Sequence, residues 1–201
     1  KGKNYLNPKL ELLVDEAIDL ESKEKLKNYL EKKLYELITS ELSNLVNLSK
    51  AKFKNNYVRA LCYQLFENNG VIKREIVHKM IKNISKEDRL SIRKAGIKIG
   101  RYHIFLPRML KPSAVELRVK LWKLHFPEDK QYIIPKSGLN FLKDESKKNN
   151  KFLLICGFEN FEKFYVRVDI LERFFLKVIE NTKGGMFNID SAMINLIGCN
   201  K

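Results

Sequence analysis

The residues of this 201-residue chain that are best suited to chemistry are its cations, and they gather in one window. Residues 89–126 carry ten lysines and arginines and one acid, Glu116, so more than half of the formal net charge of +15 lies there. Cations neutralise phosphates and aromatic rings stack on bases, so the window is typical of a surface for single-stranded nucleic acid. The candidate binding residues are Arg93, Lys94, Lys98, Arg101, Tyr102, His103, Arg108, Lys111 and Arg118.

Within this set, five cations are expected to contact phosphates, and two ring-bearing residues are candidates for stacking on a base. The phosphate contacts are assigned to Lys98, Arg101, Arg108, Lys111 and Arg118. Base stacking is assigned to Tyr102 or His103. Contacts of this kind carry little sequence preference, because phosphates are the same at every position of a strand.

Other interpretations of the window remain open. The cations could form a solvated face, or they could meet the acids of a protein partner. Lysine is abundant along the whole chain, as in the products of AT-rich genes, but five of the nine arginines fall within 89–126. A basic amphipathic helix could also lie on a membrane surface, although this one is embedded between other elements. No apolar run approaches the roughly 20 residues that span a bilayer, so we expect no membrane partner.

Motifs that would indicate catalysis are missing from the sequence. It has no GxxxxGK[ST] or GxGxxG phosphate loop, no HExxH and no GxSxG. Asp15, Glu16 and Asp19 could together bind Mg²⁺, but such a group is more typical of plain surface charge. The three cysteines form no CxxC pair, which favours a reducing compartment over disulfides or zinc. We therefore expect no catalytic residue, no metal and no cofactor in this segment.

The spacing of apolar residues predicts a mainly α-helical fold, a helical bundle with a few short strands and a small α+β C-terminal subdomain. Three domains or segments are expected: 1–126 as a helical accessory domain with the basic face, 127–151 as a polar linker or loop, and 152–201 as the subdomain. Helices are predicted over 22–46, 53–67, 71–84, 85–95, 112–125, 169–181 and 189–199. Extended segments are predicted over 8–16, 97–106 as a hairpin, and 152–158 as a buried strand.

Three local patterns give these elements their expected roles. The leucines of 22–46 recur at steps of three and four, which predicts a stripe that faces the core. Ser85 with Asp88 forms a capping-box pattern, and Asp169 with Glu172 repeats it. The helices over 53–67 and 71–84, separated by a glycine turn, would also be compatible with a helix-turn-helix.

Several blocks of the sequence resemble the alphaproteobacterial superfamily II RNA helicases related to the mitochondrial degradosome helicase. The segment "RKAGIKIGRYHIFLPRMLKPSAVELRVKLWKL" is similar to that family's L-R-x-L-G-V-R-x-G, L-P-x-L-L-K-P and L-R-x-x-L-W patterns, with Met109 where leucine is usual. The segment "CGFENFEKFYVRVDILERF" resembles its V-R-x-D-x-L-E-R block, and "FNIDSAMINLIGC" its F-x-[VI]-x-x-x-M-x-x-L-x-G-C segment.

The resemblance implies that this chain is the region C-terminal to two motor lobes. ATP and Mg²⁺ would then bind in the motor of the parent chain, an ATP-dependent RNA helicase of the bacterial cytoplasm involved in RNA degradation. The implied partners are single-stranded RNA, the motor lobes in cis and an exonuclease. Two functions follow: an RNA-binding accessory region that grips the strand beside the motor, or a docking scaffold for a degradosome-type partner without RNA contact.

Overall fold

The computed structural model describes residues 4–13, 19–143, 149–161 and 164–198. The chain is mainly α-helical with two small three-stranded antiparallel sheets, which confirms the predicted fold class. Parts of three predicted elements lie outside the described residues: positions 14–16 of the extended segment 8–16, residues 144–148 of the polar segment, and Cys199. Asp15 and Glu16 lie outside them as well.

Residues 20–125 form six α-helices and a small sheet. The helices are α1 (Leu20–Glu41), α2 (Ser43–Lys50), α3 (Asn56–Glu67), α4 (His78–Lys82), α5 (Lys86–Lys94) and α6 (Pro112–His125). The 3-10 turns η1 (Arg74–Val77) and η2 (Pro107–Leu110) lie between them. The sheet has the order β1-β3-β2, from β1 (Val71–Lys73), β3 (His103–Phe105) and β2 (Lys98–Ile99).

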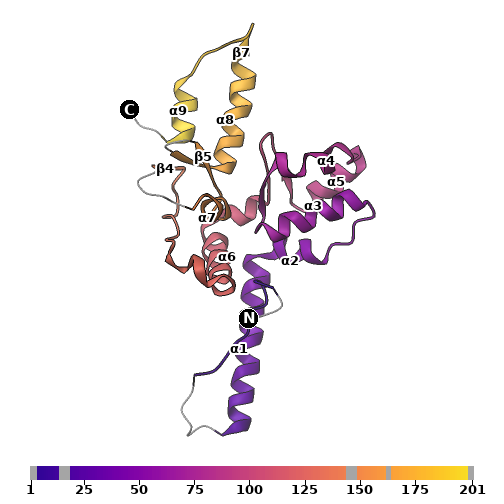
Figure 1. The fold of residues 1–201 in the computed structure, drawn as a ribbon, viewed down its shortest axis with the longest axis vertical. Helices are drawn as coiled ribbons and strands as arrows, with labels where there is room; N and C mark the ends of the chain where they lie inside the picture. The colour runs from indigo at the N-terminus through magenta and orange to yellow at the C-terminus, as the bar shows by residue number, and fades with distance from the viewer. Residues whose placement is uncertain (1–3, 14–18, 144–148, 162–163, 199–201) are drawn as a thin grey trace.

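Helix α1 differs from its prediction in part, because two leucines of its stripe do not face the core. Figure 1 shows α1 projecting from the body of the molecule, whereas the next helix, α2, lies within the body. Asp19 caps the first turn of α1, and the helix ends at Glu41. Ile38 and Leu42 are buried, but Leu26 is 39% and Leu37 48% exposed. The prediction that the stripe faces the core is therefore confirmed for its C-terminal part, where Leu34 also packs against the core, and is wrong for Leu26 and Leu37.

Helix α3 ends in a glycine turn as predicted, but the residues that follow do not form the predicted helix 71–84. Asn69 has φ 56°, its N–H donates to the Phe66 carbonyl, and the N–H of Gly70 donates to the Leu65 carbonyl. This Schellman turn reverses the chain. Residues 71–73 then pair with β3, with Ile72 opposite Ile104. Because a strand follows α3, the helix-turn-helix interpretation is wrong.

The segment that carries most of the candidate residues forms as predicted. Ser85 and Asp88 complete the capping box that begins α5. Strands β2 and β3 form an antiparallel hairpin around Gly100, with Ile99 opposite Ile104. Pro112 occupies the first turn of α6, where its missing N–H costs no hydrogen bond.

The C-terminal part contains the second sheet and two further projecting helices (Figure 1). Its elements are η3 (Pro127–Gln131), β4 (Phe141–Lys143), α7 (Asn150–Ile155), β5 (Phe158–Phe161), β6 (Phe164–Arg167), α8 (Val168–Asn181), β7 (Thr182–Lys183), β8 (Met186–Phe187) and α9 (Ser191–Ile197). The sheet order is β4-β6-β5. The predicted buried strand 152–158 is wrong in type: Asn149 caps a helix there, and only Phe158 belongs to a strand.

Buried apolar clusters link the two halves of the described chain. Val119 and Trp122 of α6 pack in one cluster with Phe152 of α7. A smaller cluster joins Phe105 of β3 to Val168 of α8. These two clusters contain residues from both sides of the predicted boundaries at 126 and 151. The division into domains stays a prediction.

A single carboxylate connects α8 to the turn of the β2–β3 hairpin. Glu172 is buried, and its two carboxylate oxygens accept the backbone N–H groups of Arg101 (2.5 Å), Tyr102 (2.8 Å) and His103 (2.7 Å). A Cβ atom at Gly100 would lie 2.4 Å from this carboxylate, so only glycine leaves room for it. Glu172 thus does not cap α8, as its spacing from Asp169 predicted, but fixes a turn 70 residues earlier.

His103 lies between two carboxylates in the same region. Its Nε2 is 2.8 Å from Glu159 of β5 and its Nδ1 is 3.4 Å from Glu172, while Lys73 also contacts Glu159 at 2.7 Å. Burial alone lowers the pKa of His103, but the bonds to both carboxylates outweigh it and the pKa lies above the ordinary value. Burial raises the pKa values of Glu159 and Glu172, and the bonds from His103 and its neighbours bring both below normal.

Replacing Glu172 by glutamine should lower the free energy of unfolding by about 2–4 kcal/mol, because three backbone N–H groups lose a buried, charged acceptor. Urea denaturation followed by circular dichroism measures this change. Glu180→Gln, an exposed position on the same helix, is the matched control and should stay within about 0.5 kcal/mol of the parent. Equal stability of the two variants would contradict the assigned role.

Stability should also depend on pH on both sides of a maximum. The raised pKa of His103 adds stability that is complete below its ordinary value of 6.5 and is lost as pH rises through the folded-state pKa. The lowered pKa values of Glu159 and Glu172 add stability that is complete above 4.5 and is lost as pH falls through theirs. Urea denaturation at a series of pH values should therefore give a maximum between about 4.5 and 6.5.

The His103→Gln variant separates the two sides of this profile. It should remove the contribution of His103 to the decline above the maximum and only reduce the acid side, because Glu159 and Glu172 lose their bond to His103 but keep Lys73 and the backbone N–H groups of the turn. An alkaline decline as steep as that of the parent chain would assign it to other groups.

Candidate nucleic-acid interface

Six of the nine predicted binding residues are exposed cations on neighbouring elements. Arg93 and Lys94 end α5, Lys98 lies on β2, and Arg101 is in the turn between β2 and β3. Arg108 lies on η2, and Lys111 immediately precedes α6. The capping box and the hairpin register set these positions, so the placement follows from short-range sequence signals.

Part of this set surrounds one cleft, which we call the α5 cleft. It has a volume of about 500 Å³ and is lined by Arg89, Ile92, Arg93, Gly96, Ile97, Lys98, Ile99 and Pro107. Gly96 has φ 81°, a left-handed conformation that ends α5 and turns the chain into β2. Three cations therefore line an apolar floor made by the isoleucines of α5 and β2.

These cations have no acidic partners of their own. Among the residues that the structure describes, no carboxylate forms an ion pair with Arg89, Arg93, Lys94, Lys98, Arg101, Arg108 or Lys111. The Lys98 ammonium lies 5.7 Å from the centre of the Phe105 ring. Lys120, by contrast, pairs with Glu116 at 2.6 Å on α6. The charge of 89–111 is thus uncompensated in this part of the chain.

Arg118 is a correction, because it cannot contact a phosphate. It is completely buried, and its guanidinium donates to the backbone carbonyls of Asn69 and, at 3.0 Å, Met109. Burial lowers its pKa to about 10, and no carboxylate in the described residues pairs with it. Arg118 therefore holds the α3–β1 turn and η2 against α6, which is a structural role.

His103 is a second correction. It is buried, with both ring nitrogens directed at Glu159 and Glu172. A ring enclosed in this way cannot stack on a base. Tyr102 remains available, since its side chain is 46% exposed and lies against Phe175 of α8 with ring centres 4.1 Å apart.

Arg101 and Tyr102 belong to a second cleft, which we call the aromatic cleft. Its volume is about 500 Å³, and its lining residues are Lys73, Arg74, Glu75, His78, Arg101, Tyr102, His103, Glu159, Asn160, Phe161, Leu171 and Phe175. The sequence prediction missed Arg74 and His78 because it placed both on one continuous helix over 71–84, where the structure has β1, η1 and α4 in turn. Phe161 and Phe175 have no local signal, since they reach the cleft only through the packing of β5 and α8.

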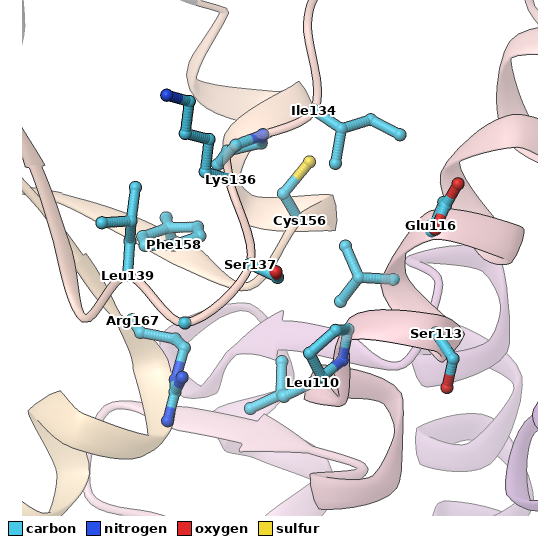
Figure 2. A pocket seen from close by; sticks show the side chains of 14 residues that line it. Leu110, Ser113, Glu116, Ile134, Lys136, Ser137, Leu139, Cys156, Phe158 and Arg167 are labelled. Atoms are coloured by element: carbon cyan, nitrogen blue, oxygen red, sulfur yellow. The ribbon is translucent and has the colours of Figure 1, made fainter.

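A third cleft, of about 440 Å³, lies where the start of α6 meets the segment 134–139 (Figure 2). Its walls are mainly apolar, from Leu110, Ile134, Leu139 and Phe158. Cys156 faces this space, but burial raises its pKa to about 12, so the thiol stays protonated and is a poor nucleophile. Arg167 at the edge is already paired with Asp169 at 2.7 Å. We assign no binding role to this cleft.

Comparisons of the chain with protein families, with curated proteins and with solved structures return no match. No helix in the described ranges combines the length and apolar character that crossing a membrane requires. Nor do three His, Cys, Asp or Glu side chains come together there as metal ligands would.

The two classes of arginine can be told apart by stability. Arg118→Met should lower the free energy of unfolding by about 2–3 kcal/mol, because it leaves two buried carbonyls without donors. Arg93→Met makes the same chemical change at an exposed site and should stay within about 0.5 kcal/mol of the parent. Urea denaturation of both variants checks this, and a loss at Arg93 as large as at Arg118 would contradict the assignment.

Proposed function

We propose that this chain is an RNA-binding accessory region of an ATP-dependent helicase and grips the backbone of a single strand beside the motor. The observation that carries the proposal is the row of exposed cations on α5, β2 and η2 that no described carboxylate neutralises. Cations held on a folded surface without acidic partners attract a polyanion. Arg89, Arg93 and Lys98 around the α5 cleft are the primary phosphate contacts, with Arg108 and Lys111 extending the row.

The surface would act by slowing dissociation of the strand. Each phosphate neutralised by a cation releases counterions, which favours binding without regard to sequence. The apolar floor of the α5 cleft offers no pattern of hydrogen-bond donors and acceptors that would read a base edge. A helicase motor that moves along RNA needs such a sequence-independent grip near it.

The helicase context comes from the resemblance of the L-P-x-L-L-K-P and V-R-x-D-x-L-E-R blocks. In this proposal ATP and Mg²⁺ belong to the motor lobes, which act in cis, and the whole protein works in the bacterial cytoplasm in RNA degradation. Arg118 and Glu172, two of the residues that carry the resemblance, are both buried and both hold parts of the basic segment in place.

A docking scaffold is the second candidate, and α1 favours it. This helix projects from the body, and Leu26, Tyr29 and Leu37 are exposed on it. Exposed apolar residues on a helix are typical of a surface that another protein covers. In that case the partner is an exonuclease or the motor itself, and the cations would meet its acids.

Titration of the chain with fluorescent oligo-U at increasing salt separates the two functions. We expect micromolar or tighter binding at 50 mM salt. With five phosphate contacts, log K should fall with log salt at a slope of roughly −3.5, a loss on the order of a hundredfold by 200 mM. No binding tighter than millimolar at low salt would favour the scaffold.

Charge reversal tests where the contacts lie. Arg93→Glu combined with Lys98→Glu should weaken binding strongly and reduce the magnitude of the salt slope by about 1.4, the share of two phosphates. Lys25→Glu combined with Lys32→Glu, on the exposed surface of α1, makes the same change in net charge; this control should leave the slope intact. Equal effects of the two changes would place the site elsewhere.

A further inference from the structure

The aromatic cleft combines ring surfaces and cations in a way that the phosphate grip alone does not require. Tyr102 comes from the β2–β3 turn, Phe161 from the end of β5 and Phe175 from α8. Tyr102 is 46% and Phe161 42% exposed, so two rings meet water inside one cleft. Removing aromatic surface from water is favourable, so a planar ligand that covers these two rings gains binding free energy.

The Tyr102 ring is fixed before any ligand arrives. Its backbone N–H donates to Glu172, and its ring rests on Phe175 with an interplanar angle of 40°. The guanidinium of Arg74 donates to the carbonyl of Gly100 at 2.7 Å, which holds the other side of the turn. A ring held in this way loses little conformational freedom when a ligand stacks on it.

The aromatic cleft has one compensated carboxylate, Glu159, and one exposed cation without an acidic partner in the described residues, Arg101. Glu159, the interior carboxylate, is neutralised by Lys73 at 2.7 Å and bonded to His103 at 2.8 Å. Arg101 at the edge is exposed and has no acidic partner in the described residues, whereas Glu75 is an exposed acid nearby. An uncharged planar group fits the interior, and a phosphate fits beside Arg101.

The two clefts are built on the same hairpin. Lys98 on β2 lines the α5 cleft, and Arg101 and Tyr102 in the following turn line the aromatic cleft. Lys98 and Arg101 are three residues apart, which is at most about 11 Å of extended chain, so one strand can contact both residues. The volume of about 500 Å³ is in the range of pockets that hold one small ligand.

We infer that the aromatic cleft receives one unstacked nucleobase of the bound strand, stacked on Tyr102 with its phosphate at Arg101. The inference rests on the proposed RNA binding and adds a base-holding subsite to the phosphate contacts. Stacking tolerates every base, because each has a π face, so the site increases affinity without strong sequence preference.

The experiment uses oligo-U and an abasic strand of the same length, each titrated against the parent chain and the Tyr102→Ala and Tyr102→Phe variants. Tyr102→Ala should weaken oligo-U binding roughly tenfold at every salt concentration and leave the salt slope unchanged, because no phosphate contact is lost. Tyr102→Phe should bind like the parent. The abasic strand should bind the parent and Tyr102→Ala equally.

Each contrary result has a defined meaning. If Tyr102→Ala weakens both strands equally, or weakens neither while the charge reversal at Arg93 and Lys98 abolishes binding, the base subsite is wrong and the phosphate grip stands. If the parent chain binds no oligo-U at low salt, the proposed function and this inference fail together. Phe161→Ala, an exposed ring on another element, repeats the test should Tyr102→Ala lower the urea midpoint, and it should give the same selective loss for oligo-U.

Discussion

The arrangement of the candidate interface depends on one buried carboxylate. Glu172 accepts three consecutive backbone N–H groups from the β2–β3 turn, and the absence of a side chain at Gly100 lets it approach. Without Glu172 the buried N–H of His103 and the part-buried N–H groups of Arg101 and Tyr102 would lose their acceptor, which is costly. This contact connects α8 to the basic segment, places Tyr102 on Phe175, and sets Arg101 at the edge of the aromatic cleft. The C-terminal part of the chain thus determines the geometry of a surface whose charge comes from the middle.

The cations of the basic segment fall into two groups, one buried and one exposed to water, and the two groups have different functions. Arg118 loses its hydration on burial and gains hydrogen bonds to two backbone carbonyls, but it pairs with no described carboxylate. These hydrogen bonds offset part of the cost of burying its charge. The cations of α5, β2 and η2 are exposed to water and have no acidic partner among the described residues, so their charge is available to a ligand. A count of charged residues cannot make this distinction, because both groups add equally to the net charge. Only burial separates a cation that holds the core together from one that can bind a ligand.

Short-range patterns were sufficient for the elements that carry the phosphate contacts. The capping box at Ser85, the hairpin around Gly100 and the proline at the start of α6 are all encoded within a few residues. Prediction failed where the type of element depends on distant partners: residues 71–73 become a strand only because β3 lies alongside, and the apolar run 152–158 is compatible with either a helix or a strand. The aromatic cleft could not be predicted, since its rings come from the hairpin turn, β5 and α8.

Helix α1 has a mechanical consequence for anything attached to its free end. Its 22 residues span roughly 33 Å at the usual rise, and its C-terminal part is anchored in the body through Leu34 and Ile38, with the adjoining Leu42. A continuous helix is stiff, so a load applied near Leu26 acts as on a lever whose fulcrum lies at the junction with α2. A protein bound near Leu26 would be held at a fixed distance from the cationic surface. A movement of that protein would exert a torque on the core through α1.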